Sequence, residues 1–450
     1  MKHTQILFFV TIILTFSCSR TLHAQDETKA TKYRRSSICM VLIESDNFER
    51  KETVIKAYSN APFPDKYNDH SLTSKSFDPK KYSITEADRK AAGTDKSATG
   101  KMVSGMASKA TNGIVDNTAA DNTLIINKYI KENKIANQLV AKWFDRKPDG
   151  SFDMSVIADR GFYNASEMEA SIASKEKKGR ASLSDAGIEL LENTFVVFSK
   201  MSFVSNEPVA RVIRDVAKAE AAKNIKMPML LKKANEAADA AYEKTKEGYS
   251  VWTTSYLYRL KWNDSVANVF YTDLWIDKSN PDPKKKAAFD ETNLFELELV
   301  GDEKASSIVL FSLKEKRTED QIIEIATVRN IDAVFAKLEK EYEVFRPKVP
   351  LSTVEPITAK IGMKEGMEGG EKFEVLEQTA DPETGLTQYK RKATIKLDGE
   401  LVWDNRYNAG EEPQVAEVKE GEEKKPVLDR STFNGKGKNL YAGMLIRQIE

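Results

Sequence analysis

The hydrophobic pattern of this chain alternates between short runs that are apolar on both faces and longer segments with apolar residues at helical spacing. The first run, residues 36–44 (SSICMVLIE), is too short and too rich in β-branched residues for a helix, and its pattern is typical of a central strand. An amphipathic segment from Phe48 to Tyr58 follows and ends before APFP at 61–64, which predicts a helix. A second buried strand is expected at 194–198 (TFVVF). A strand followed by a helix is the start of an α/β layer.

Helical spacing returns in several later segments. Residues 123–144 carry one apolar stripe, residues 183–193 form a short amphipathic segment, and residues 318–342 present a continuous apolar face. The segment 208–246 is rich in Ala, Lys and Glu, and its helical pattern is broken near Pro228. This break predicts a helical hairpin.

Two runs rich in aromatic and β-branched residues, 252–260 and 267–276, flank a short polar link at 261–265. This arrangement predicts an antiparallel β-hairpin. Trp262 lies in the link between Lys261 and Asn263, where an aromatic side chain has no obvious core to fill. We therefore take these three residues as the candidate binding contact of the chain. The other tryptophans considered, Trp252, Trp275 and Trp403, are expected in cores.

The pattern changes at residues 345–350 (FRPKVP). Short alternating strands are expected beyond it, separated by glycine-containing turns, which predicts a small barrel. The sequence therefore predicts an α+β (or α/β) main domain with helical segments over residues 25–347, followed by a small C-terminal all-β barrel domain over residues 351–450. The expected barrel strands are residues 357–361, 372–377, 388–397, 401–404 and 440–449.

Two segments lack the patterns of regular structure. Residues 74–122 are polar and contain scattered glycines, which favours a long mobile insertion. A glycine-rich phosphate cradle is the alternative, but neither G-x-G-x-x-G nor a Walker pattern occurs there. Residues 410–425 are acidic and lack aromatic residues, and we expect a disordered loop.

The N-terminus has the pattern of a signal peptide over residues 1–24. A basic Lys2 precedes an apolar run at 6–16, and cleavage is expected after Ala24. A lipid anchor at Cys18 is the alternative, although residues 15–17 (TFS) make a poor lipobox. No later segment is long and apolar enough to span a membrane. We therefore expect an exported chain, periplasmic or outer-membrane-associated, that is soluble or peripherally attached after cleavage.

Composition narrows the chemistry available to this chain. The full sequence has 69 basic and 69 acidic residues, which gives no indication of nucleic-acid binding. After the first 24 residues are removed, Cys39 is the single cysteine and His70 the single histidine, so an intrachain disulfide, a histidine-rich zinc site and a cysteine cluster are excluded. We expect Cys39 to be buried in its strand and His70 to be bonded to nearby backbone. No catalytic residue, metal site or cofactor is nominated.

Five stretches of the sequence carry a resemblance to known proteins: RSS (35–37), PDKYNDH (64–70), ADRGFY (158–163), TSYLYRL (254–260) and ITAKIGMKEG (357–366). Together they resemble a family of uncharacterised exported proteins of Gram-negative bacteria, a family to which no activity is assigned. The resemblance spans most of the chain after residue 24 and implies its two-domain architecture. Residues 359–376 are also similar to the module of two strands and a glycine turn in envelope proteins of the curli-secretion and flagellar-assembly type. Those proteins pair an α/β domain with a small β module.

Two functions remain open on this evidence. The first is a non-enzymatic periplasmic or envelope-associated binding or assembly protein, with an envelope protein or a cell-wall component as its partner. The second is an envelope hydrolase that uses paired carboxylates on a glycan or peptidoglycan. A cleft lined by close acids, one with a raised pKa, would favour the hydrolase. An exposed apolar patch without such acids would favour the binding protein.

Overall fold

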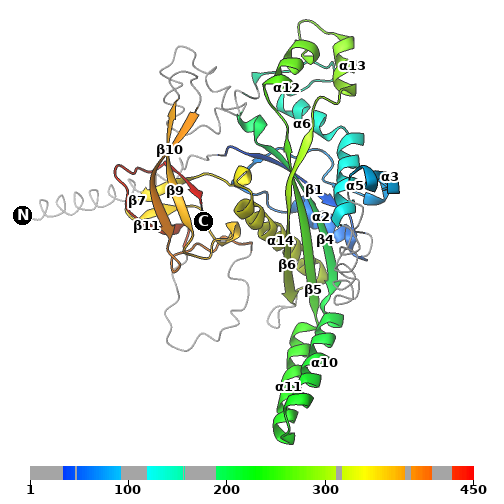
Figure 1. The fold of residues 1–450 in the computed structure, drawn as a ribbon, viewed down its shortest axis with the longest axis vertical. Coiled ribbons are helices and arrows are strands. Elements are labelled where there is room, and N and C mark those ends of the chain that lie inside the picture. The colour runs from blue at the N-terminus through cyan, green and yellow to red at the C-terminus, as the bar shows by residue number, and fades with distance from the viewer. Residues whose placement is uncertain are drawn as a thin grey trace, which may run out of the picture.

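Figure 1 shows the fold in the computed structural model, which describes residues 34–45, 48–92, 119–155, 157, 189–310, 317–380, 387–407 and 428–449. The predicted signal peptide, residues 93–118 of the predicted insertion, residues 183–188 and the predicted acidic loop at 410–425 lie outside these ranges. The chain forms a main domain of helices around a mixed sheet and, near the C-terminus, a closed antiparallel β-barrel. Both parts of the predicted fold class are present.

The main sheet has the strand order β2-β1-β4-β5-β6, and β3 also pairs with β1. The predicted first strand is β1, which is buried along its whole length and runs parallel to β4. The pairs β4–β5 and β5–β6 are antiparallel. The strands are β1 (Ser37–Ile43), β2 (Asn68–Asp69), β3 (Ser76–Phe77), β4 (Thr194–Ser205), β5 (Gly248–Leu260) and β6 (Leu297–Leu310).

Successive residues of β1 and β4 belong to cores on opposite faces of this sheet. Ile38 and Val197 belong to a core with helices α2 (Lys51–Asn60) and α14 (Glu319–Glu341). Cys39 and Val196 belong to the opposite core, with helices α5 (Ala119–Glu132) and α6 (Ile135–Trp143). The residues expected to form one helix at 123–144 thus form two, because Lys134 between them has a left-handed backbone (φ 51°).

The described part of residues 74–122 is folded, which corrects the expectation of a mobile insertion for these residues. It contains β3, a 3₁₀ turn η1 (Pro79–Lys81) and helix α3 (Glu86–Ala91). Helix α3 begins with a capping box in which Thr85 and Asp88 bond each other's backbone N–H groups. Asp88 also pairs with Lys128 of α5 at 3.0 Å. These contacts hold α3 against α5.

The predicted antiparallel hairpin at 252–276 is wrong. After β5 the chain forms helix α12 (Asp264–Val269) and a π-helical segment η3 (Phe270–Leu274), and helix α13 (Pro283–Glu291) follows. The partner of β5 is β6 instead. Asn263 starts α12, because its side-chain oxygen accepts a hydrogen bond from the N–H of Val266 at 3.0 Å.

The predicted helical hairpin is present. Helices α10 (Asn206–Asn224) and α11 (Pro228–Thr245) lie between β4 and β5 and pack on each other. Figure 1 shows this pair projecting beyond the ends of β4, β5 and β6. Pro228 occupies the first helical position of α11, where its missing N–H removes no intrahelical hydrogen bond. No helix in the described ranges is both long and apolar enough to cross a bilayer.

The C-terminal barrel closes in the order β10-β11-β8-β7-β12-β9, with every pair antiparallel. The predicted strand at 401–404 is wrong: the N–H of Trp403 donates to the side chain of Ser431, and Trp403 makes only an isolated bridge with Gly362. A Cβ at Gly362 would lie 2.2 Å from the Trp403 carbonyl oxygen, so this approach requires glycine. The barrel strands are β7 (Val349–Val354), β8 (Ile357–Ala359), β9 (Lys372–Ala380), β10 (Thr387–Leu397), β11 (Ser431–Gly435) and β12 (Leu445–Gln448).

Candidate functional site

The predicted contact residue Trp262 is enclosed in a core, which removes the basis of its nomination. Its side chain is 8% exposed and stacks on Phe295 with ring centroids 6.2 Å apart. Lys261 forms an exposed ion pair with Glu296 at 3.2 Å, and Asn263 caps α12. Because the chain turns into a helix after β5, Trp262 folds onto an aromatic cluster and is not displayed at a hairpin tip.

His70 and Cys39 have the structural positions expected of them. His70 is fully buried and stacks on Trp143, and its Nε2 lies 3.0 Å from the carbonyl oxygen of Leu139. A carbonyl only accepts, so this nitrogen carries the proton. Cys39 is fully buried, and burial raises the pKa of its thiol to about 11. The thiolate required of a cysteine nucleophile is thus disfavoured.

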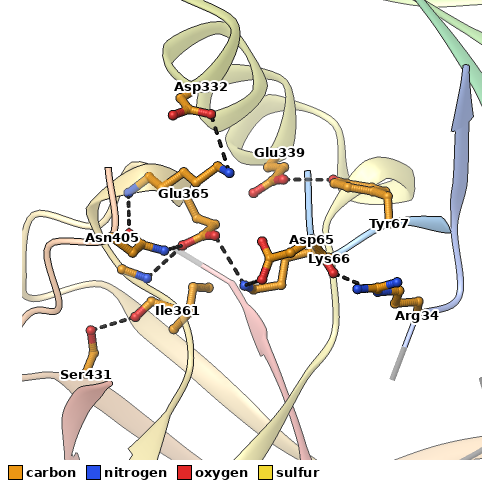
Figure 2. Close-up of polar contacts among 12 residues, drawn as sticks. Arg34, Asp65, Lys66, Tyr67, Asp332, Glu339, Ile361, Glu365, Asn405 and Ser431 are labelled. Atoms are coloured by element: carbon orange, nitrogen blue, oxygen red, sulfur yellow. Dashed lines mark hydrogen bonds and ion pairs between the residues drawn. The ribbon is translucent and has the colours of Figure 1, made fainter. Parts of the chain in front are cut away.

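A cluster of polar contacts lies where the main domain meets the barrel (Figure 2). We call it the junction cluster. It brings together a loop that leads into β2, helix α14, and the turn η5 (Met363–Glu365) of the barrel domain. Its ionisable members are Asp65, Lys66, Tyr67, Asp332, Glu339, Lys364 and Glu365.

Glu339 is a buried acid of the junction cluster, 6% exposed. Burial, aided by the nearby carboxylate of Glu365, raises the pKa of Glu339 to about 8. The hydroxyl of Tyr67 lies 2.9 Å from Glu339 Oε1 and 2.8 Å from the carbonyl oxygen of Phe345. The Tyr67 hydroxyl has one proton for these two acceptors, and a protonated Glu339 that donates to Tyr67 frees that proton for Phe345. The geometry thus agrees with a neutral Glu339.

Glu365 makes three contacts, of which the one with Lys66 crosses from the barrel domain to the main domain. Its carboxylate accepts hydrogen bonds from the N–H of Gly362 at 2.8 Å and from the amide of Asn405 at 2.9 Å, and it lies 3.4 Å from Lys66 Nζ. Lys66 also pairs with Asp65 at 2.8 Å. Burial lowers the pKa of Lys66, but these two carboxylates outweigh burial and leave the pKa above its ordinary value. Lys66 is therefore charged.

A second ion pair of the junction cluster links Asp332 of α14 to Lys364 of η5, 3.7 Å apart. Burial raises the pKa of Asp332 to about 6, with Glu365 adding to the shift and Lys364 opposing it. Asp332, Glu339 and Glu365 are each less than a tenth exposed. Their partners are protein groups, so the junction cluster fastens the domains together and offers no open acid pair to a substrate.

A basic pocket of about 230 Å³ opens beside the junction cluster. Residues from both domains line it, and Lys66 is shared between the pocket and the cluster. The uncharged residues of the wall are Ser36, Asn193 and Val344. The pocket-lining side chains that carry charge are the cations Arg35, Lys66, Arg346, Lys348 and Arg447 and the carboxylate Glu343.

Most of these cations have a nearby carboxylate, but Arg346 and Lys348 have none within ion-pair distance in the described chain. The Arg346 guanidinium donates to three backbone carbonyls and pairs with no carboxylate of the described residues. Lys348 is half-buried, with Nζ 4.4 Å from the centre of the Tyr389 ring. Burial lowers the pKa of Lys348, and Arg447 and Arg35 lower it further, although Glu189 opposes them. An anionic group in the pocket would relieve this repulsion.

The chemistry of the basic pocket suits a carboxylate or a phosphate. Guanidinium and ammonium groups are the side chains that proteins use to hold both anions. In the described ranges, no group of three or more His, Cys, Asp or Glu side chains is arranged to hold a metal ion. The arrangement can bind and orient an anionic group.

The sequence alone did not predict the basic pocket, although several of its residues lie in segments with distinctive patterns. Arg346 and Lys348 lie in the FRPKVP segment that marked the change of pattern. Stretches quoted for the family resemblance, RSS at 35–37, PDKYNDH at 64–70 and ITAKIGMKEG at 357–366, contribute residues to the pocket or to the junction cluster. No family model matches the chain, and no curated protein matches it.

Proposed function

We propose that this chain is a non-enzymatic periplasmic or envelope-associated binding or assembly protein that holds an anionic group of its partner in the basic pocket. The partner is an envelope protein or a cell-wall component, both of which carry carboxylates or phosphates. The observation that carries the proposal is a pocket with five cationic side chains and one carboxylate, two of whose cations lack an acidic partner among the described residues. The signal-peptide pattern at residues 1–24 supports export.

The alternative is a hydrolase that uses paired carboxylates, and one observation favours it. Glu339 has a pKa of about 8 and a second acid, Glu365, close enough to raise it. A general acid of this kind must reach substrate, and Glu339 is 6% exposed and faces Tyr67. Release of sugar or peptide fragments from peptidoglycan by the wild-type chain, abolished in Glu339→Gln, would replace our proposal with this one.

We expect Lys348→Met to weaken retention of an envelope component on the immobilised chain at least about tenfold, because one of five cations is lost from the pocket. This change removes the charge of Lys348 and keeps an apolar stem of similar length. Wild type should retain the component, inorganic phosphate should release it in competition, and the matched control Lys436→Met, at an exposed barrel lysine outside the pocket, should behave as wild type. Quantitative mass spectrometry of the retained material measures the difference. Retention that is equal in wild type and Lys348→Met would contradict the proposal.

A further inference from the structure

The turn between α10 and α11 places an apolar surface at the far end of a projecting arm. Figure 1 shows this hairpin extending away from the rest of the molecule along its longest axis. The arm is braced along its length: Tyr242 donates to Glu207 at 2.8 Å, and Lys218 pairs with Asp239 at 2.6 Å. With 18 residues in α11, the arm is about 27 Å long.

Large apolar side chains are exposed at this tip. The exposed fractions are 61% for Met227, 73% for Met229 and 49% for Leu230. All three lie in the turn or the first turn of α11, where the neighbouring helix has ended at Asn224. Their exposure is costly in water, and a surface of this kind indicates a binding site.

Lysines flank the apolar tip along the chain, and no acid lies between them. Residues 221–235 (AAKNIKMPMLLKKAN) contain four lysines and no Asp or Glu. Lys223 and Lys232 pair with Glu220 and Glu236 on their own helices. Such exposed pairs within one helix are weak and leave the lysines available. An exposed apolar centre flanked by lysines is the pattern of a surface that meets anionic headgroups and acyl chains together.

We propose that this tip binds the surface of a bilayer that contains anionic phospholipid. Met227, Met229 and Leu230 would enter the boundary between headgroups and acyl chains, and the lysines would contact lipid phosphates. Two tips from separate copies would place lysines of like charge together, which disfavours self-association. Three side chains also make a smaller surface than the roughly 800 Å² per partner that a stable protein interface buries.

Co-sedimentation with vesicles tests the proposal. The vesicles contain either phosphatidylcholine alone or phosphatidylcholine with phosphatidylglycerol, and binding is measured at low and at high salt. Wild type should bind only the vesicles that contain phosphatidylglycerol, and less at high salt. The triple variant Met227→Ser/Met229→Ser/Leu230→Ser should bind them at least about tenfold more weakly.

A matched control keeps the test specific to the tip. The variant Val212→Ser/Ile213→Ser/Val216→Ser removes three side chains of similar exposure on the shaft of α10, about 12 Å or more from its end. It should bind vesicles as wild type does, and circular dichroism should show all three proteins equally folded. Equal binding by the tip variant and wild type, or no binding to phosphatidylglycerol vesicles, would overturn the proposal. A change of oligomeric state confined to the tip variant would do the same. None of these changes touches the basic pocket, so the two proposals fail separately.

Discussion

Glu365→Ala should lower the free energy of unfolding by about 3 to 5 kcal/mol. The change leaves the amide of Asn405 and the N–H of Gly362 without their acceptor, and it removes one of the two carboxylates beside Lys66. The Lys66 side chain is 12% exposed, so its remaining charge is expensive to bury. Urea denaturation followed by tryptophan fluorescence measures the loss.

The neighbouring Glu368→Ala is the control for Glu365→Ala. Glu368 is exposed in the same turn region, and its hydrogen bond to Glu371 uses its backbone N–H. Its replacement should change the free energy of unfolding by less than about 0.5 kcal/mol. Equal and small effects of the two changes would show that the junction cluster does not fasten the domains.

We expect wild type to become less stable as pH rises and the Glu339→Gln variant to lack this loss. The folded-state pKa of Glu339 is about 8 and its ordinary value is 4.5, so the folded chain holds a proton in this interval that the unfolded chain releases. Neutral Glu339 therefore stabilises the wild-type fold fully below about pH 4.5. This stabilisation is lost as pH rises toward 8. Asp332, with a folded-state pKa of about 6, adds to this trend at the acid end.

The expected advantage of Glu339→Gln above pH 8 is on the order of 3 to 5 kcal/mol. Glutamine is neutral at every pH and its amide can donate to Tyr67 as the protonated acid does. Glu341→Gln, at an exposed acid of the same helix, should leave the wild-type pH profile unchanged. Urea denaturation across this pH range measures both variants. Parallel pH profiles for wild type and Glu339→Gln would contradict a neutral Glu339.

Sequence patterns predicted the helices and strands whose pattern of apolar residues is contained in one short segment of the chain. The run at 36–44 is apolar on both faces, and β1 is buried on both. The apolar face at 318–342 became α14, which packs against β5, β6 and α2. The helical hairpin was also predictable, because the break at Pro228 is local.

Features that depend on distant parts of the chain were missed. Trp262 stacks on Phe295, which lies 33 residues further along the chain, and also packs on Phe144, which lies far earlier. Glu339 and Glu365 are two of 69 acidic residues, and nothing near them in the sequence shows that they meet Tyr67 and Lys66. The basic pocket combines segments from both ends of the chain, including Arg35 and Arg447. Such convergence is a property of the tertiary fold.

Isothermal titration calorimetry with inorganic phosphate tests the central claim, anion recognition in the basic pocket, most directly. Wild type should bind phosphate with a 1:1 stoichiometry. Lys348→Met should bind at least about tenfold more weakly, since it loses one charge-assisted hydrogen bond. Lys436→Met should bind as wild type does. Absence of binding to wild type, or equal affinity in wild type and Lys348→Met, would contradict the account.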